Sequence, residues 1–123
     1  MQMARTILIV DDSTSIRQIV AFTLKQAGFA VLEGSNGQEG LAQLDTQRVD
    51  LIVTDLNMPV MDGITFVKNV RSRPNTKGVP VLMLTTESQD SKKKEGKAAG
   101  ATGWLVKPFH PEKLLQTIAR VLP

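Results

Sequence analysis

The chain has 123 residues, of which 41% are hydrophobic and 22% charged, and its formal net charge is +3. This length and composition predict one globular domain over residues 1–123 and exclude intrinsic disorder, and no apolar run reaches the roughly 18 residues that a membrane span needs. Since there is no Cys and only one His, a disulfide scaffold, a thiolate metal site and a cysteine nucleophile are excluded too. We therefore expect a cytoplasmic protein without membrane contact.

Short apolar runs alternate along the chain with segments whose apolar residues recur at helical spacing. The strands and helices predicted in chain order are strand 7–10, helix 13–27, strand 30–33, helix 38–47, strand 51–54, a helix striped by Ile64, Val67 and Val70, strand 79–84, helix 89–99, strand 104–106 and helix 111–122. Gly28 and Gly100 stand where helix C-caps are expected, and Asp62 before Gly63 is interpreted as a cap or turn residue.

Strands that are almost wholly apolar and alternate with helices indicate a parallel sheet covered on both faces. Five such units are too few for a closed eight-fold barrel. We therefore predict an α/β fold, a doubly wound five-stranded parallel sheet of the flavodoxin type with strand order 2-1-3-4-5.

Ligands of such sheets bind outside the carboxyl ends of the strands, so the residues that follow each strand are informative. Those polar residues are Asp11, Asp12, Asp55, Asn57, Thr85, Thr86, Glu87 and Lys107. Any one of the acidic residues alone is better explained as a cap or a solvated loop residue. Three carboxylates at one edge repel one another, however, and therefore call for a cation. Oxygen ligands favour Mg²⁺, and the lack of Cys disfavours zinc.

Lys107 supplies a positive charge at the same edge. With the predicted strand order, its strand lies two positions from that of Asp55, roughly 10 Å away, a gap that a long ammonium side chain spans. Thr85, one strand nearer, adds a hydroxyl. A cation, an ammonium and a hydroxyl around one carboxylate form a cage suited to a phosphoryl group attached to that carboxylate.

Three stretches carry a resemblance to a known family, namely ILIVDDS at 7–13, DLNMPVMDG at 55–63 and VKPF at 106–109. Together with Thr85 they resemble, in order and spacing, the signature residues of receiver domains of bacterial two-component response regulators. The resemblance covers essentially the whole chain. Within the family it is strongest to the single-domain chemotaxis regulators, which implies a receiver without an output domain.

The resemblance implies a role for each site residue. Asp55 is the phosphoacceptor for a histidine kinase, Asp12, Asp55 and the main-chain carbonyl of Asn57 bind Mg²⁺ directly, and Asp11 does so partly through water. Lys107 and Thr85 contact the phosphoryl oxygens, and the Lys107–Pro108 peptide is expected to be cis. Asn57 and Glu87 tune dephosphorylation, and fairly fast self-dephosphorylation is the hypothesis.

The resemblance also implies how phosphorylation changes partner binding. Thr85 and Trp104 match the family's residues that couple the two. The family usually has Tyr or Phe where Trp104 stands, so an indole that only covers the sheet edge is an open alternative. The expected partner face is basic and comprises Lys92, Lys93, Lys94, Lys97 and Trp104. It suits an acidic segment, such as that of a flagellar switch protein. A solvated helix face remains the alternative explanation of the lysine run.

The leading hypothesis is a monomeric phosphorylated signalling protein, not an enzyme, that acts in chemotaxis through the flagellar motor switch. A phosphorelay shuttle between histidine domains uses the same site. An aspartate-nucleophile phosphohydrolase is a further alternative, but its general acid would stand at Asn57, and an amide does not protonate a leaving group. A nucleic-acid module, suggested by the basic charge, lacks a groove-reading helix and a stacking platform.

Overall fold

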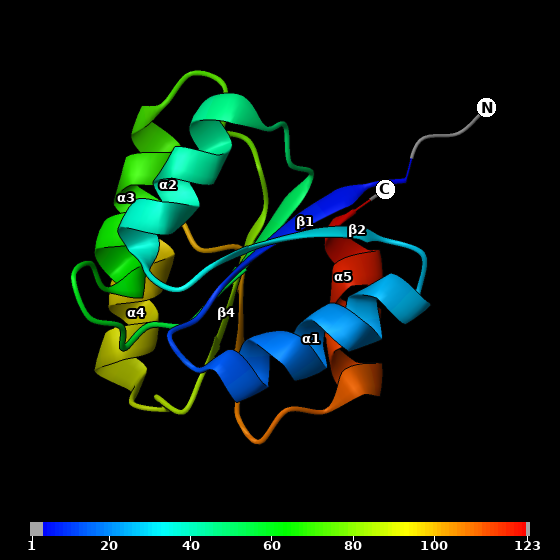
Figure 1. The fold of residues 1–123 in the computed structure, drawn as a ribbon. Helices are drawn as coiled ribbons and strands as arrows, with labels where there is room; N and C mark the ends of the chain where they lie inside the picture. The colour runs from blue at the N-terminus through cyan, green and yellow to red at the C-terminus, as the bar shows by residue number, and fades with distance from the viewer. Residues whose placement is uncertain (1–3, 123) are drawn as a thin grey trace.

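The computed structural model describes residues 4–122, over which strands and helices alternate (Figure 1). The strands are β1 (Thr6–Val10), β2 (Ala30–Gly34), β3 (Leu51–Thr54), β4 (Val81–Thr85) and β5 (Gly103–Val106). The helices are α1 (Thr14–Gln26), α2 (Gly37–Thr46), α3 (Gly63–Ser72), α4 (Asp90–Ala99) and α5 (Pro111–Val121).

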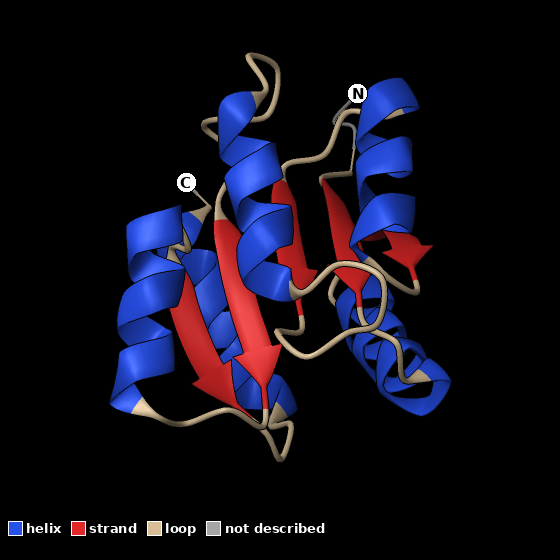
Figure 2. Ribbon diagram, turned by 90° about the vertical axis from the view of Figure 1, so that its left-hand side faces the viewer, coloured by secondary structure: helices blue, strands red, loops and turns tan. Residues whose placement is uncertain are grey.

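The five strands form one parallel sheet in the order β2-β1-β3-β4-β5, which confirms the predicted fold class. Figure 1 shows α2, α3 and α4 on one face of the sheet and α1 and α5 on the other, and Figure 2 shows the strands between the two helical layers. In the register, Val10 lies opposite Thr54, and Thr85 lies opposite Val106. The residues that follow these strands therefore meet at one edge of the sheet.

Two apolar layers, one on each face of the sheet, hold the helices against the strands. Along β1, Leu8 and Val10 join the layer under α2 and α3, whereas Ile7 and Ile9 join the layer under α1 and α5. Every residue of β3 and β4 is buried. Since burying one such aliphatic side chain is worth about 1.5–3 kcal/mol, the central strands form a rigid base for the loops at their ends.

Side-chain caps define where three helices begin. Ser13, Asn36 and Asp62 each accept a hydrogen bond from the backbone N–H three residues later, at the starts of α1, α2 and α3. The interpretation of Asp62 as a cap is thereby confirmed. Gly100, in the left-handed conformation with φ 116°, is the C-cap of α4 as predicted. For α1, however, the C-cap is Ala27, and Gly28 follows it with φ 97°.

The strand predicted at 79–84 begins later than expected. Val79 donates its N–H to the Thr76 carbonyl in a turn, and its own carbonyl accepts from Arg71, so neither group is left for the sheet. The strand instead starts at Val81 and includes Thr85.

Among the described residues, no helix combines the length and the apolar character that spanning a membrane requires.

Candidate functional site

Three carboxylates meet at the carboxyl edge of the sheet, as the sequence predicts. One oxygen from each of Asp11, Asp12 and Asp55 lies within 4.8 Å of the others. Asp11 and Asp55 are 3% and 8% exposed, whereas Asp12 is exposed. The cluster is therefore open to solvent on the Asp12 side and enclosed by the sheet on the other.

Backbone contacts fix the position of Asp55. Its N–H donates to the Val10 carbonyl at 2.9 Å, which holds it beside β1, and its Oδ1 accepts from the Leu56 N–H at 2.7 Å. The loop then returns to begin α3 at Gly63, whose N–H donates to the Leu56 carbonyl at 2.7 Å. With one carboxylate oxygen engaged by the main chain, Oδ2 is the oxygen that faces the cluster.

Lys107 reaches this cluster from β5, as predicted. Its N–H donates to the Thr85 carbonyl, and its Nζ lies 3.4 Å from Asp55 Oδ2. The same Nζ is closer to Asp11 Oδ2, at 3.0 Å, a pairing that strand order and spacing do not predict. The following Lys107–Pro108 peptide is cis, which confirms that expectation.

Burial acts against the charge of Asp11. Desolvation raises the pKa of its carboxyl above the ordinary value, and the nearby Asp55 carboxylate raises it further. The Ser13 N–H, which donates to Oδ1 at 2.9 Å, and the Lys107 ammonium lower the pKa and only partly offset this effect. A cation bound in the cluster would therefore stabilise the ionised form of the Asp11 carboxylate, which burial otherwise disfavours.

Three of the other predicted site residues lie at the end of β4 or in the loops that follow β3 and β4. Thr85 is fully buried at the end of β4, and its Oγ1 accepts from the Glu87 N–H at 3.3 Å. Asn57 is exposed in the loop after β3. Glu87 is partly exposed in the loop after β4.

The predicted partner face is only partly assembled. Lys93, Lys97 and Trp104 line one cavity of about 280 Å³ between α4 and β5. Lys92 does not line it but pairs with Glu95 in the next turn of the helix at 3.3 Å. Lys94 is exposed on the helix and does not line that cavity either.

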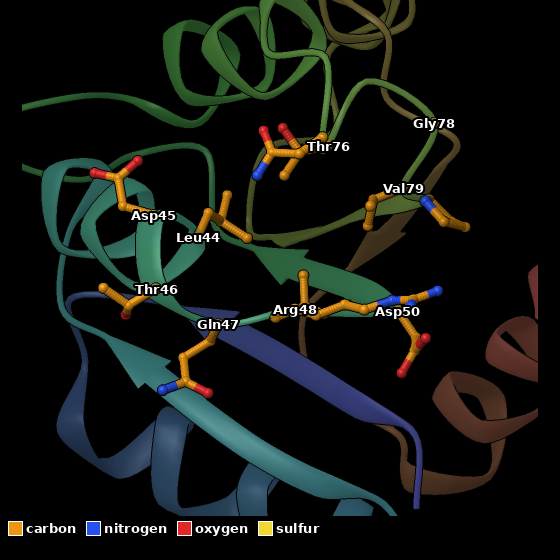
Figure 3. Close-up of a pocket in the computed structure, with 12 residues that line it drawn as sticks. Leu44, Asp45, Thr46, Gln47, Arg48, Asp50, Thr76, Gly78 and Val79 are labelled. Carbon is orange, nitrogen blue, oxygen red and sulfur yellow. The ribbon is translucent and has the colours of Figure 1, made fainter. Parts of the chain in front are cut away.

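A larger cavity of about 590 Å³ lies at the opposite, amino end of the sheet. Figure 3 shows it between the loop after α2, which includes Arg48 and Asp50, and the loop of Thr76 and Gly78 before β4. Its lining brings no group of three metal-ligating side chains together within the described part of the chain. Cavity size therefore does not identify the chemical site here.

The donor set of the acidic cluster fits a hard divalent cation. All the side-chain ligands that the cluster offers are carboxylate oxygens, and its open side leaves room for water. Mg²⁺ prefers oxygen donors and retains several waters, and it is usually held by one or two carboxylates. The residues present thus satisfy the requirements of a magnesium site.

The fold and this edge define a flavodoxin-like α/β domain built around a carboxylate site at the carboxyl ends of its strands. The chain belongs to the response regulator receiver domains, since the model of that family matches residues 7–119. Receiver domains are signalling modules of two-component systems, which use a histidine kinase as phosphodonor and act on a target.

Relatives of two kinds match the chain. It is 38% identical over 118 residues to the chemotaxis protein CheY1 of Helicobacter pylori, covering 94% of this chain and 95% of that protein. The solved structure of CheY4 of Vibrio cholerae is 55% identical, with a TM-score of 0.94 over 98% of this chain and 100% of the other. The transcriptional regulator PhoB of Escherichia coli is 36% identical over 98% of this chain, which spans only 52% of its length.

Gly63 and Ser13 at the acidic site, and Gly96 on α4, have structural roles that the sequence pattern did not predict. Gly63 allows α3 to begin against the Asp55 backbone, since an added Cβ would collide with the Asp55 carbonyl oxygen. Ser13 holds Asp11 through its N–H. Gly96, on α4, lies against Trp104. Gly63 follows a cap residue in the sequence, which was a usable signal; Gly96 stands in a polar helix and gave none.

Proposed function

We propose that the protein is the phosphoacceptor of a chemotaxis pathway and that Asp55 carries the phosphoryl group. The observation that supports this most directly is the convergence of Asp11, Asp12 and Asp55 with the Lys107 ammonium at one edge of the sheet. The identity to chemotaxis proteins along nearly their whole length supports chemotaxis over transcription.

In the transfer step, Asp55 Oδ2 attacks the phosphorus of a phosphohistidine on the kinase. An O–P bond forms, the N–P bond breaks, and the imidazole leaves with the electron pair and takes up a proton. Lys107, already 3.4 Å from Oδ2, contacts a phosphoryl oxygen and offsets its charge, and the Thr85 hydroxyl donates to another. Phosphoryl transfer depends mainly on such positioning and charge neutralisation.

Mg²⁺ is the cofactor of this step. Asp12, Asp55 and the Asn57 main-chain carbonyl would hold it directly, and Asp11 partly through water. When bound, the cation neutralises charge on the transferred group. Asp55 needs no rearrangement to take part, since its Oδ1 is already fixed by the Leu56 N–H.

The signal ends when water attacks the phosphorus and breaks the O–P bond, which regenerates the Asp55 carboxylate and releases phosphate. Asn57 and Glu87 lie in the two loops beside the site and adjust access of that water. We expect fairly fast self-dephosphorylation, and a phosphoryl group that persists for hours in the isolated protein contradicts this.

The target docks on the face formed by Lys93, Lys97 and Trp104, whose basic charge and aromatic surface suit an acidic peptide of a flagellar switch protein. Lys92 contributes less than the sequence suggested because Glu95 neutralises it. The protein acts as a cytoplasmic monomer in this scheme, without turnover of an external substrate.

The test is incubation with Mg²⁺ and a small phosphodonor such as acetyl phosphate, followed by mass spectrometry of the intact protein. One phosphoryl group is expected on the wild type and none on Asp55→Asn. Asp62→Asn is the matched control, because Asn also caps helices and leaves the site intact. Modification of Asp55→Asn to the wild-type extent would contradict the proposal, and sustained hydrolysis of varied phosphoesters would favour the phosphohydrolase instead.

The partner is tested separately with an acidic peptide from a flagellar switch protein and beryllofluoride as the phosphoryl mimic. Lys93→Glu with Lys97→Glu should weaken binding at least tenfold, the scale of losing two rim charge pairs of about 0.2–1 kcal/mol each plus like-charge repulsion. Lys68→Glu, an exposed charge reversal on α3, should leave affinity unchanged. Equal affinity of the wild type, the double variant and Lys68→Glu for the peptide would show that the partner does not bind this face. That result would favour the phosphorelay shuttle instead.

A further inference from the structure

Of the three carboxylates in the acidic cluster, that of Asp12 is the one that the sheet does not enclose. Asp11 and Asp55 are buried, whereas Asp12 is exposed and lies in the loop between β1 and α1. The position of the Asp12 carboxylate therefore depends on the main chain that carries it. A contact that fixes this loop also fixes where Asp12 meets a cation.

Two hydrogen bonds hold the loop around Asp12. The Ser13 N–H donates to Asp11 Oδ1 at 2.9 Å, which folds the chain into a turn over Asp12. The Asp11 carbonyl, which belongs to the peptide group that joins Asp11 to Asp12, accepts from Nη1 of Arg17 at 2.6 Å. Because a peptide group is planar, this second bond fixes the orientation of the main chain on the N-terminal side of Asp12.

The guanidinium of Arg17, on the first turn of α1, is itself held in place. Besides the Nη1 bond, Nη2 donates to the Thr14 hydroxyl at 3.4 Å, and Nε lies 3.4 Å from Oε1 of Glu33 in β2. The Arg17 side chain is 16% exposed. Since the guanidinium is a rigid planar fork, partners at all three nitrogens give it one orientation, and it supports the Asp11 carbonyl from α1 and β2 together.

The positive charge of Arg17 is not what recommends it at a cation site. A guanidinium beside the acidic cluster repels a second cation, so its direct electrostatic effect on metal binding is unfavourable. Its shortest contact is with a main-chain carbonyl of the loop and not with the carboxylate of Glu33. The arrangement favours a role in geometry over a role in charge.

We propose that Arg17 is a positioning residue of the magnesium site and that it acts through the Asp11 carbonyl to hold the Asp12 carboxylate where Mg²⁺ needs it. The proposal rests on the proposed function, in which Asp12 binds Mg²⁺ directly. Mg²⁺ demands near-ideal octahedral geometry, whereas Ca²⁺ accepts irregular sets of oxygen ligands. Arg17 therefore raises the affinity for Mg²⁺ and also the preference for Mg²⁺ over Ca²⁺.

The test is titration of the unphosphorylated protein with Mg²⁺ and, separately, with Ca²⁺, followed by nuclear magnetic resonance of the amides of residues 11–13. Arg17→Met should raise the Kd for Mg²⁺ roughly tenfold, the scale of losing a group that orients a metal ligand, and raise the Kd for Ca²⁺ by a smaller factor. Lys25→Met, which removes an exposed positive charge from the same helix, should leave both Kd values unchanged. Tighter binding of both cations by Arg17→Met, or an equal loss for both, would overturn the proposal.

A charge-balanced variant separates geometry from charge more strictly. Arg17→Met combined with Glu33→Gln removes both members of the ion pair and leaves the net charge of this region as it is in the wild type. The Kd for Mg²⁺ should rise roughly tenfold in this double variant too. A wild-type Kd would show that the loop does not need the guanidinium.

Amide exchange in the metal-free protein tests the support of the loop without any cation. The Ser13 N–H, which donates to Asp11, should exchange several-fold faster in Arg17→Met, because the turn over Asp12 has lost its other support. The N–H of Val20, a buried residue of α1, should keep its wild-type exchange rate, which shows that the helix is intact. Unchanged exchange at Ser13 would contradict the link between Arg17 and the loop.

The outcomes keep this proposal and the proposed function apart. A wild type that binds Mg²⁺ but accepts no phosphoryl group refutes the proposed function, and the titrations of the Arg17 variants still decide the positioning role. A wild type that is phosphorylated normally, together with Arg17→Met that binds Mg²⁺ as tightly, refutes the positioning role alone. A wild type that binds no Mg²⁺ refutes both.

Discussion

Substituting Gly63 by alanine tests how the Asp55 loop is held. Gly63 begins α3 while its N–H donates to the Leu56 carbonyl. A Cβ at this position would collide with the Asp55 carbonyl oxygen and lie 2.8 Å from the Leu56 Cα. Both neighbours are backbone atoms, so no side chain can turn away, and the loop that carries the proposed phosphoacceptor must shift.

The magnitude follows from two opposing effects. Overpacking of a methyl group costs about 1–3 kcal/mol, and a backbone neighbour places this case at the upper end. Loss of unfolded-state freedom on replacing glycine by alanine returns about 0.4–1 kcal/mol. The free energy of unfolding of Gly63→Ala should therefore fall by about 2 kcal/mol, which lowers the Tm of a chain of this size by about 8 °C.

Thermal and urea unfolding followed by circular dichroism measure this loss, with Gly78→Ala as the matched control. Gly78 has open space around an added methyl and no left-handed backbone conformation, so its substitution should be neutral or raise the Tm by about 2–4 °C. Gly63→Ala should also accept phosphoryl groups more slowly, because Asp55 is displaced. Equal Tm values for both variants would refute the reasoning that main-chain contact fixes this loop.

Arg71→Met keeps the aliphatic stem but removes the hydrogen bonds to the carbonyls of Lys77, Val79 and Gly100. Urea unfolding should show that the free energy of unfolding falls by about 2–3 kcal/mol, with a smaller fall for Arg73→Met. Equal losses in the two variants would contradict a stabilising role for these three hydrogen-bonded carbonyls. Beryllofluoride with Mg²⁺ should change the emission of Trp104, since the hydrogen bond from its Nε1 to the Glu87 carbonyl is altered; an unchanged spectrum counts against coupling there. Burial raises the pKa of Asp11, so its contribution to stability is present below the ordinary carboxyl pKa and is lost as pH rises through the raised value. Asp11→Asn should therefore stabilise the metal-free protein at neutral pH and flatten the pH dependence of urea unfolding, and a variant less stable than the wild type at pH 7 would show that pairing with Lys107 outweighs burial.

The fold was predictable because the apolar pattern carries most of its stability. All strands and helices were expected in the observed order, and β3 was predicted with its observed limits. The start of β4 was missed for a tertiary reason, since the carbonyl of Val79 accepts a hydrogen bond from the side chain of Arg71 on α3. Apolar runs predict which residues are buried, but not which backbone groups a distant side chain occupies.

The acidic cluster was predictable because parallel strands bring residues after their carboxyl ends together. The pairing of Lys107 was not fully predictable, because strand spacing shows that the ammonium reaches the cluster but does not choose between Asp55 and Asp11. The contact of Gly96 with Trp104 was beyond reach of the sequence for a similar reason. The contact depends on where α4 crosses β5. The sequence of α4 does not predict that position, because the helix has a single buried residue.

The net charge of the chain is a poor guide to its ligands, because the charges that matter are local. One ammonium, that of Lys107, faces three carboxylates in the cluster, so the site remains negative although the chain is positive overall. In the proposed function, Asp11, Asp12 and Asp55 would hold a divalent cation, whose charge would neutralise Asp11. Lys107 could then leave its 3.0 Å contact with Asp11 and turn toward the phosphoryl group on Asp55. The cation and the phosphoryl group would then favour each other's binding, because the cation would free Lys107 from Asp11 and the phosphoryl group would give Lys107 a new anionic partner.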